Sequence, residues 1–175
     1  YFFLAVSFQL CIHITEEGGQ VIINDINEER LEILSKKYNA HVVLGKYIYG
    51  LDVDIYAPCA LGATINDTTI HQLKAKVIAG AANNQLADEI KHGRMLKEKG
   101  ISYAPDFLIN AGGIINVYAE LEGYGKEEIK NKTENIYNTT LAIFELSKKE
   151  NIATHRAAFN IAQQRIAHRK KVSNS

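Results

Sequence analysis

Cysteine, proline and tryptophan are scarce in this 175-residue chain, which contains two cysteines, two prolines and no tryptophan. Cys11 and Cys59 lie far apart in the sequence and lack the spacing of metal ligands, so no metal site is expected. Two buried, unpaired thiols are typical of a reducing compartment, and we therefore expect a cytoplasmic protein. A chain of this length can bury a substantial hydrophobic core.

The chain also lacks an excess of charge of either sign, because 20 basic residues balance 20 acidic ones. Without a broad positive field, neither nucleic acid nor an anionic membrane surface is expected as a partner. Residues 1–14 are mostly apolar, but they are too short to span a bilayer and carry no basic segment typical of a targeting signal. The composition is therefore that of an ordinary globular protein.

Short apolar segments alternate with longer amphipathic segments over the first two thirds of the chain. The short segments predict β-strands at residues 20–26, 41–43, 53–57, 76–79 and 101–103. The longer segments predict helices at residues 6–17, 28–38 and 87–99, with a short helix or turn at 65–73. This alternation predicts an α/β fold: a doubly wound parallel sheet with right-handed crossovers and helices on both faces.

Only helices are predicted after residue 117, chiefly at residues 126–148 and 153–171. Their apolar stripes indicate which side chains face the rest of the protein. The first stripe contains Ile129, Thr133, Ile136, Tyr137, Thr140 and Phe144, and the second contains Ala158, Ile161, Ala162 and Ile166. A helical tail is therefore expected after the sheet.

Polar or small residues follow four of the predicted strands, which is where ligands bind in open α/β sheets. Asp25 could accept hydrogen bonds from the two hydroxyls of an adenosine ribose and would repel a 2′-phosphate, or it could cap the following helix. The small residues at 57–63 leave room for a flat ring, and no nearby histidine makes Cys59 a nucleophile. The amides at 83–85 could bind a carboxamide or a carboxylate, or cap a loop.

Residues 104–117 form the fourth of these strand ends. Pro105 ends a short strand because it cannot donate to a β-ladder. Asn110 then precedes Gly112 and Gly113, and an apolar helix is predicted to open just after them. Paired glycines let backbone amides approach a ligand, and the positive end of the helix would point at the same place. The alternative is a tight turn that packs the helix onto the sheet.

Five long motifs carry a resemblance to a known family. They are residues 24–27 (NDIN), 54–63 (DIYAPCALGA), 73–80 (LKAKVIAG), 82–86 (ANNQL) and 103–117 (YAPDFLINAGGIINV). In this order the motifs resemble the nucleotide-binding domain of the amino-acid dehydrogenase superfamily, and within it the leucine dehydrogenases. The resemblance extends from about residue 6 to residue 166 and implies a Rossmann-like fold.

The resemblance implies NAD as the cofactor and assigns residues to it. Asp25 would bind the adenosine ribose. Cys59, Ala60, Asn83 and Asn110 would lie along the nicotinamide and its ribose.

The resemblance also implies an activity, the oxidative deamination of branched-chain L-amino acids such as leucine to 2-oxo acids and ammonia. Asn84 would approach the carboxylate of the amino-acid substrate, and Ile114 and Val117 would wall a pocket for its aliphatic side chain. Shape selection in such a pocket discriminates by only a few kcal/mol, about 1–3 per methylene. A phenylalanine or glutamate dehydrogenase relative therefore remains an alternative.

Two features of the family are not found in this sequence. A glycine-rich turn should hold the pyrophosphate about twenty residues before Asp25, but residues 2–7 contain no glycine, and Phe2 and Leu4 are expected to fill that space. No lysine matches the family's catalytic lysine, which belongs to a front domain, so no catalytic residue is predicted here. Three lysines are expected at the surface instead: Lys46, Lys74 and Lys76.

We therefore expect a fragment of a longer enzyme. Residues 1–120 would form a dinucleotide-binding domain that lacks its first strand, and residues 121–175 would form C-terminal helices packed on the same domain. The expected partners are the missing front domain and further copies of the chain, because an absent strand leaves an exposed sheet edge. The alternative is a catalytically inactive product that acts at most as a binding or assembly module.

Overall fold

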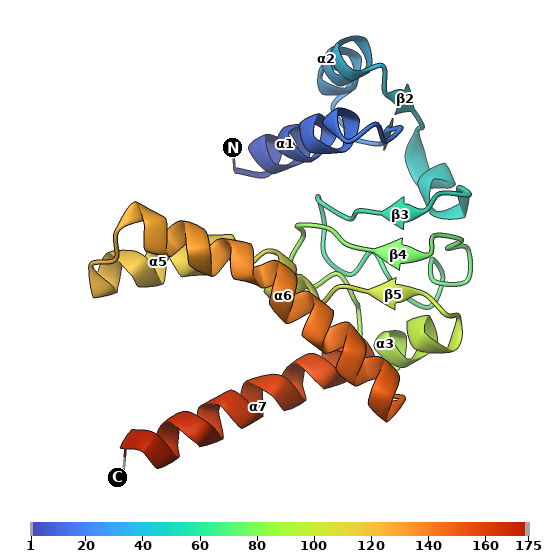
Figure 1. Ribbon diagram of the computed structural model, residues 1–175. Coiled ribbons are helices and arrows are strands. Elements are labelled where there is room, and N and C mark those ends of the chain that lie inside the picture. The colour runs from blue at the N-terminus through green and yellow to red at the C-terminus, as the bar shows by residue number, and fades with distance from the viewer. Residues whose placement is uncertain (1, 174–175) are drawn as a thin grey trace.

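Parallel β-structure forms the centre of the protein, as seen in a computed structural model that describes the backbone of residues 2–173 and the side chains of residues 8–169. Strands β3 (Ile55–Tyr56), β4 (Val77–Ile78) and β5 (Ser102–Tyr103) form a three-stranded parallel sheet in the order β3-β4-β5 (Figure 1). Strands β1 (Ile22–Ile23) and β2 (His41–Val42) form a separate parallel pair. A parallel α/β class is thereby confirmed.

Helices connect and follow the strands. They are α1 (Phe2–Glu16), α2 (Glu28–Tyr38), the 3-10 helix η1 (Gly45–Gly50), α3 (Glu89–Glu98), α4 (Asp106–Ile109), α5 (Gly112–Glu122), α6 (Lys126–Glu150) and α7 (Thr154–Ser173). No described helix is long and apolar enough to cross a membrane. Residues 66–72 form turns, so of the two interpretations of this segment the turn is correct.

Helix α2 begins and ends at the residues predicted from the sequence because both of its ends carry local signals. The side chain of Asn27 accepts a hydrogen bond from the Arg30 N–H and caps the first turn. Asn39 adopts the left-handed conformation that ends many helices. The interpretation of Asp25 as the helix cap is therefore wrong, because Asn27 occupies that position.

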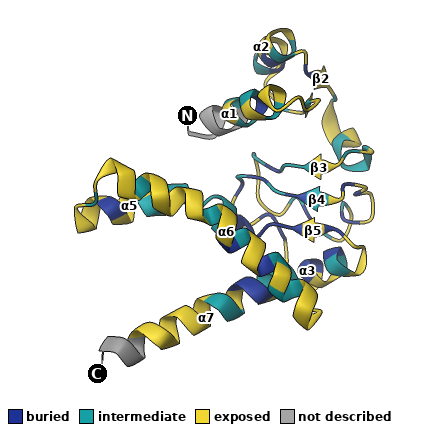
Figure 2. Cartoon of the chain, in the orientation of Figure 1, coloured by how far each residue is buried: buried dark blue, intermediate teal, exposed yellow. Residues whose placement is uncertain are grey.

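The main core covers one face of the three-stranded sheet. Tyr56, Ile78 and Tyr103 occupy equivalent positions on that face, and the last two are buried. The buried segments lie mainly along the loops of the sheet and on α3 and the start of α7 (Figure 2). Buried residues from α3 and the turns complete this core: Ile65, Ile70, Leu73, Leu86, Leu96 and Ile101. A second cluster between α1 and α2 contains Cys11, Ile23, Leu31, Leu34 and Ala40. The prediction of a buried thiol is thus confirmed for Cys11.

The opposite face of the sheet is more open than the sequence predicts. Ile55, Val77 and Ser102 form the equivalent row there, and Ile55 is 56% exposed while Ser102 is exposed and Val77 half-buried. The reason is that α7 packs on β5 and α3, toward one side of the sheet, and leaves the β3 side open (Figure 1). Full coverage of both faces is therefore not found in the described part of the chain.

The two groups of strands do not share a ladder. β1 is hydrogen-bonded to β2 and β3 to β4, so each group ends at an unpaired edge. In the common doubly wound order 3-2-1-4-5-6, the first strand separates these two groups. The absence of a first strand remains a prediction.

The tail helices cover the predicted stripes in part. Of the predicted residues, Ala158 is buried and five others are half-buried: Ile129, Ile136, Thr140, Phe144 and Ile161. Thr133, Tyr137, Ala162 and Ile166 are exposed. Thr139 and Ile143 of α6 and Ala157 of α7, which were not predicted, are also buried. Because α6 contacts α4, α5 and α7, and α7 contacts α3, the direction of these neighbours, and not the apolar pattern alone, decides which side chains are covered.

Candidate functional site

The carboxyl ends of β3, β4 and β5 lie at one edge of the sheet because the strands are parallel. The loops after β3 and β4 meet there in close contact. A Cβ on Gly80 would overlap the Pro58 carbonyl oxygen, and a Cβ on Gly62 would lie 2.8 Å from the Asn83 carbonyl oxygen. Only glycine allows this approach of the two backbones.

Two residues at this edge adopt the left-handed backbone conformation, Ala63 with φ 55° and Asn84 with φ 52°. The Ala63 N–H donates to the Asn84 carbonyl oxygen and so ties the two loops together. For a residue such as alanine this conformation costs about 1–3 kcal/mol and is concentrated at functional sites. The loops are therefore held in a shape that local preference alone does not select.

Asn83 and Asn110, two of the predicted cofactor residues, lie side by side. The Asn110 Nδ2 donates a hydrogen bond to the Asn83 Oδ1 and lies 3.4 Å from the Ala81 carbonyl oxygen. Asn83 is exposed and Asn110 half-buried, so the pair is accessible at the rim of the sheet. The structure thus brings together two side chains that follow β4 and β5 and are 27 residues apart in sequence.

A buried network beneath this asparagine pair fixes both of its loops. The Tyr103 hydroxyl donates to the Asp106 Oδ1 at 3.0 Å, and the Gln85 N–H donates to the Asp106 Oδ2 at 3.3 Å. The Gln85 side-chain amide donates to the carbonyl oxygens of Gly80 and Ala82. Burial and then the neighbouring Asp106 charge raise the pKa of Tyr103. The hydroxyl therefore stays protonated and continues to donate.

Sequence reasoning did not select Tyr103 or Asp106 as site residues, and it considered Gln85 only as one of the amides at 83–85. The acidic residue directly after Pro105 was a signal in the sequence that a polar network forms at this strand end. A carboxylate buried there is costly unless it is hydrogen-bonded. The hydrogen bonds that join these residues become apparent only in the folded structure.

Cys59 and Ala60 follow β3 at the same edge. Cys59 is half-buried and Ala60 exposed. Burial raises the pKa of the Cys59 thiol, with a smaller opposing effect from a hydrogen bond to the Ala81 backbone. A thiol with a raised pKa is a poor nucleophile, which agrees with its interpretation as a residue that does not react.

Asp25 lies two residues beyond β1, between the strand and α2. Its Oδ1 accepts the Asn27 N–H at 2.9 Å, and its Oδ2 lies 3.2 Å from the Arg30 Nη1. The Asp25 side chain is 25% exposed, so solvent or a ligand can reach the carboxylate.

The apolar helix after Asn110 differs from the prediction at its start. Gly112 and Gly113 are the first two residues of α5 and do not precede it. Ile114 and Val117 are 71% and 58% exposed. With Leu121, 81% exposed, they form an open apolar stripe along α5.

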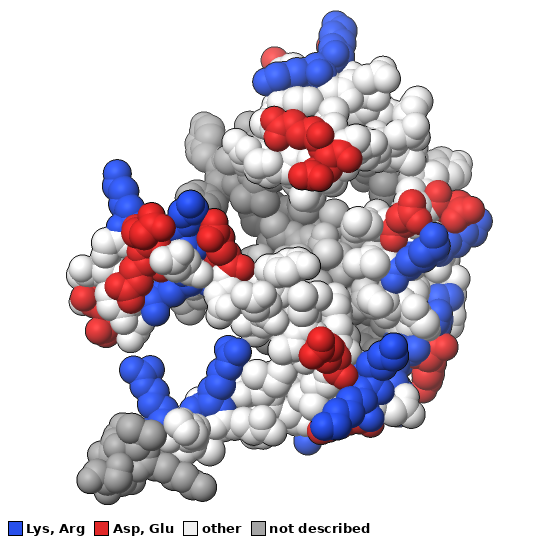
Figure 3. Space-filling model, in the orientation of Figure 1, with Lys and Arg blue, Asp and Glu red and all other residues white. Residues whose placement is uncertain are grey.

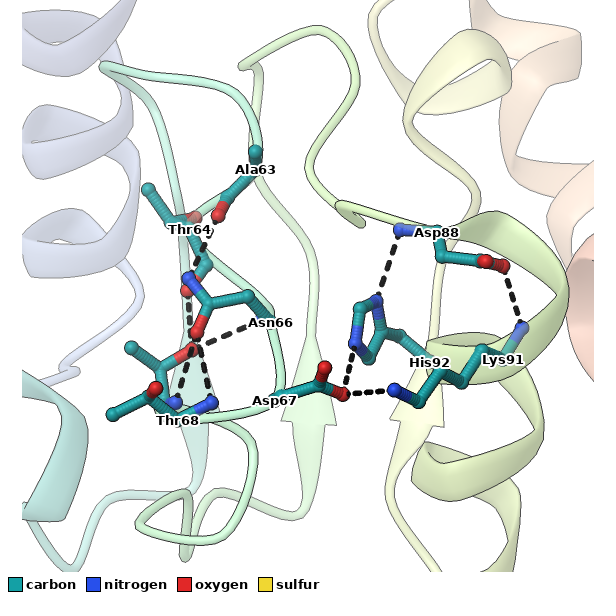
Figure 4. Close-up of polar contacts among 9 residues, drawn as sticks. Ala63, Thr64, Asn66, Asp67, Thr68, Asp88, Lys91 and His92 are labelled. Atoms are coloured by element: carbon teal, nitrogen blue, oxygen red, sulfur yellow. Dashed lines mark hydrogen bonds and ion pairs between the residues drawn. The ribbon is translucent and has the colours of Figure 1, made fainter.

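A second polar cluster joins the turns after Ile65 to the start of α3 (Figure 4). The Asn66 Oδ1 accepts two backbone N–H groups, and Asp67 contacts the His92 Nε2 at 3.1 Å and the Lys91 Nζ at 2.6 Å. The Asp88 N–H donates to the His92 Nδ1, so the Nε2 carries the proton that faces Asp67. Lys91 first, and then His92, lowers the pKa of Asp67. These contacts fasten the turn to the start of α3.

Other charged groups have surface roles. Acidic and basic side chains are interspersed on the face shown in Figure 3. Lys46, Lys74 and Lys76 are exposed, as predicted, and Lys76 pairs with Asp54 at 2.8 Å. No cluster of metal-ligating side chains occurs among the described residues.

A hollow of about 410 Å³ lies elsewhere, between α3, β5, α6 and α7. It is lined by residues such as Leu96, Ile101 and Phe144 and includes none of the predicted site residues. Its lining includes Gly100, Ile101 and both residues of β5, so this hollow lies along the strand and not beyond its carboxyl end. Ligands of open α/β sheets bind beyond the carboxyl ends of the strands, so the geometry favours the asparagine pair as the site.

A parallel α/β domain with backbone loops and side-chain amides at its carboxyl edge is typical of the class of enzymes that bind nucleotide cofactors at that edge. Residues 7–173 match the family model of the glutamate, leucine, phenylalanine and valine dehydrogenases, and the chain belongs to this family. The resemblance seen in the sequence is thereby confirmed.

Relatives of two specificities resemble the chain. The leucine dehydrogenase of Bacillus cereus is 51% identical over 162 residues, which are 93% of this chain and 44% of the relative. The L-tryptophan dehydrogenase of Nostoc punctiforme is 47% identical over 166 residues, 95% of this chain and 47% of the relative. A crystal structure of L-tryptophan dehydrogenase from Nostoc punctiforme superposes with a TM-score of 0.90 and 47% identity, covering 93% of this chain and 48% of that one. The chain thus spans about half the length of these relatives.

Proposed function

We propose that this chain supplies the cofactor-binding half of an amino-acid dehydrogenase that uses NAD to deaminate branched-chain L-amino acids oxidatively. The observation that carries this proposal is the contact between Asn83 and Asn110 at the carboxyl edge of the sheet. Two side-chain amides from different strand ends provide the donors and acceptors that a carboxamide needs.

The donor chemistry along this edge fits NAD. The Asp25 carboxylate has lone pairs left for the hydroxyls of an adenosine ribose, and Cys59 and Ala60 are small enough for a flat ring to pass. Asn83 and Asn110 would hold the carboxamide and ribose of the nicotinamide. When bound, the nicotinamide ring would accept the hydride that leaves the substrate.

The pyrophosphate is the part of the cofactor for which the fewest binding residues are predicted in this chain. The segment predicted to lack the glycine turn falls on residues 2–7, where the backbone is already part of α1. The side chains of Phe2 and Leu4, expected to fill this space, lie outside the described residues. We therefore keep the prediction that NAD binds weakly, or not at all, to the 175-residue chain alone.

The substrate would lie over the start of α5. Asn84 would donate to its carboxylate, and Ile114 and Val117 would face its side chain, because both are exposed next to the asparagine pair in sequence. Two aliphatic walls suit leucine, valine or isoleucine. An aromatic substrate is the second candidate, since a relative 47% identical to the chain is an L-tryptophan dehydrogenase.

The proton-transferring base would come from a part of the enzyme that this chain does not span. The relatives are about twice as long as their match to it, which leaves room for such a domain. Oligomerisation through the tail helices and the sheet edge is part of the same proposal.

A chimera tests the proposal directly. The matched segment of the Bacillus cereus leucine dehydrogenase is replaced by the 162 matching residues of this chain, and NADH formation is followed by absorbance with leucine, phenylalanine and tryptophan. We expect turnover with leucine to exceed that with the aromatic substrates. The Asn110→Ala variant should lose roughly 10–100-fold in kcat/KM because a positioned hydrogen-bond donor is removed.

Asn138→Ala is the matched control. Asn138 is an exposed asparagine on α6 whose side-chain amide donates a hydrogen bond to the Asn135 Oδ1. It should leave kcat/KM within about twofold, as surface substitutions usually do. A chimera that folds and assembles like its parent but shows no turnover would refute the proposed function. A preference for tryptophan would select the second candidate.

A further inference from the structure

Arg30 is the cation nearest to the carboxylate that is proposed to hold the adenosine ribose. Its Nη1 lies 3.2 Å from the Asp25 Oδ2, and the two side chains are 31% and 25% exposed. Arg30 belongs to the first turn of α2, whose other charged residues, Glu28 and Glu29, are acidic. The pair was not predicted from the sequence, where Asp25 was considered alone.

The Asp25–Arg30 pair is held in place by a hydrogen-bonded turn at Asn27. The Asn27 N–H donates to the Asp25 Oδ1 at 2.9 Å, which fixes the carboxylate just before the start of α2. The Arg30 N–H donates to the Asn27 Oδ1 at 3.0 Å, which fixes the backbone that carries the guanidinium. Asn27 thus connects both partners, and their relative position follows from the start of the helix.

This arrangement changes what the site can recognise. An unpaired carboxylate at this place accepts the 2′-hydroxyl of NAD and repels the 2′-phosphate of NADP, whereas a nearby arginine accommodates that phosphate. Here both groups are present and their charges cancel. A carboxylate has about four acceptor positions, so Asp25 keeps free lone pairs for the ribose hydroxyls while Arg30 holds one oxygen.

We propose that Arg30 is a specificity-determining residue that lets this edge bind adenosine ribose with or without a 2′-phosphate. The inference rests on the proposed function and deepens it, since it extends the ligand class from NAD to 2′-phosphorylated nucleotides. A phosphate carries a charge of about −1.5 to −2 and three strong acceptor oxygens, and a guanidinium binds it with charge-assisted hydrogen bonds. Arg30 would turn from Asp25 to the phosphate when one is present.

The test uses two ligands that differ only in the 2′-phosphate: adenosine 5′-monophosphate and adenosine 2′,5′-bisphosphate. Each is titrated into the ¹⁵N-labelled 175-residue chain, and affinity is read from the shifts of the backbone amides at 25–31. Both ligands carry the same 5′-phosphate, so any effect of the missing glycine turn on that phosphate is common to both and cancels in the ratio of their affinities. We expect the wild-type chain to bind both, with dissociation constants within about fivefold, because the pair is neutral.

Arg30→Gln should weaken binding of the bisphosphate about threefold to tenfold, the usual effect of losing one charged hydrogen bond, and change that of the monophosphate less than twofold. Asp25→Asn should tighten binding of the bisphosphate and weaken that of the monophosphate. Arg94→Gln is the matched control, since Arg94 is an exposed arginine of α3 that pairs with Glu98. It should leave the ratio of the two affinities unchanged.

The outcomes separate this inference from the proposed function. If both ligands bind and Arg30→Gln has no more effect on the ratio than Arg94→Gln, the role of Arg30 is overturned while the cofactor edge stands. If neither ligand shifts the amides at 25–31 in the folded wild-type chain, the proposed role of Asp25 fails and the role of Arg30 with it. Spectra of each variant without ligand establish that its fold is intact.

Discussion

Gly93 lies where α7 crosses α3, and substituting it measures how tightly the helical tail is docked. A Cβ at Gly93 would lie 2.6 Å from the Cε1 of His155 and closer still to its Nδ1. The His155 Nδ1 is itself buried, without a hydrogen-bond partner in the described part of the chain. The Nδ1–Cε1 edge of the imidazole therefore packs against a position that only glycine leaves open.

Two opposing effects decide the stability of Gly93→Ala. Alanine is favoured over glycine inside a helix by about 1 kcal/mol. Overpacking a well-packed contact costs about 1–3 kcal/mol, because the imidazole must leave or push the first turn of α7 away. The adjacent Ala157 and Ala158 are 0% and 5% exposed, so that turn has little freedom to move. We expect a net destabilisation of about 1 kcal/mol.

The same substitution in a His155→Ala background provides the control. There the clashing ring is absent, and Gly93→Ala should stabilise the protein by up to about 1 kcal/mol through helix propensity alone. Urea unfolding followed by circular dichroism gives both differences from the transition midpoints. The effect should change sign between the two backgrounds. Equal stabilisation in both would show that His155 does not press on Gly93, and the reasoning would be wrong.

Three further predictions concern burial, protonation and activity. Tyr103→Phe should destabilise the fold by about 1–3 kcal/mol in urea unfolding, because the buried Asp106 Oδ1 loses its donor, whereas Tyr137→Phe at a 68% exposed position should change stability by less than about 0.5 kcal/mol. Burial lowers the pKa of His155 below its ordinary value of 6.5, so the stability that favours the neutral ring is complete above that value and declines as the pH falls toward the folded pKa. The charged neighbours of the ring are Asp88 and Glu89 at the start of α3 and Arg156 on α7. His155→Asn should flatten the dependence of the urea midpoint on pH between about pH 5 and 7.5. Finally, the 175-residue chain alone should produce no NADH from leucine and NAD, and measurable turnover in an absorbance assay would contradict the assignment of the base to another part of the enzyme.

Features that depend on a few neighbouring residues were determined by the sequence itself. The bounds of α2 follow from Asn27 and Asn39, and the end of α3 follows from Gly100 in the left-handed conformation. The places of all five strands were predicted because β-branched runs and prolines or polar residues mark them, although each strand is only two residues long. Cap and strand signals act over three or four residues, so they can be read along the chain.

Features that depend on what packs against a residue were decided only by the tertiary structure. The apolar pattern of α6 could not show that Ile143 would be buried and Tyr137 exposed, because that choice depends on where α4, α5 and α7 lie. The sequence placed Asn83 and Asn110 at strand ends, but their contact spans 27 residues and requires the register of β4 and β5.

The same holds for the polar partners of the site. Asp106 meets the Gln85 N–H across 21 residues, and Arg30 reaches Asp25 only because the turn at Asn27 folds α2 back over the end of β1. Each of these contacts gains its strength from burial or from a fixed geometry, and neither is a property of a residue type or a spacing. The sequence identified the family and predicted the edge where its cofactor would bind, while the folded chain decided which charges meet there.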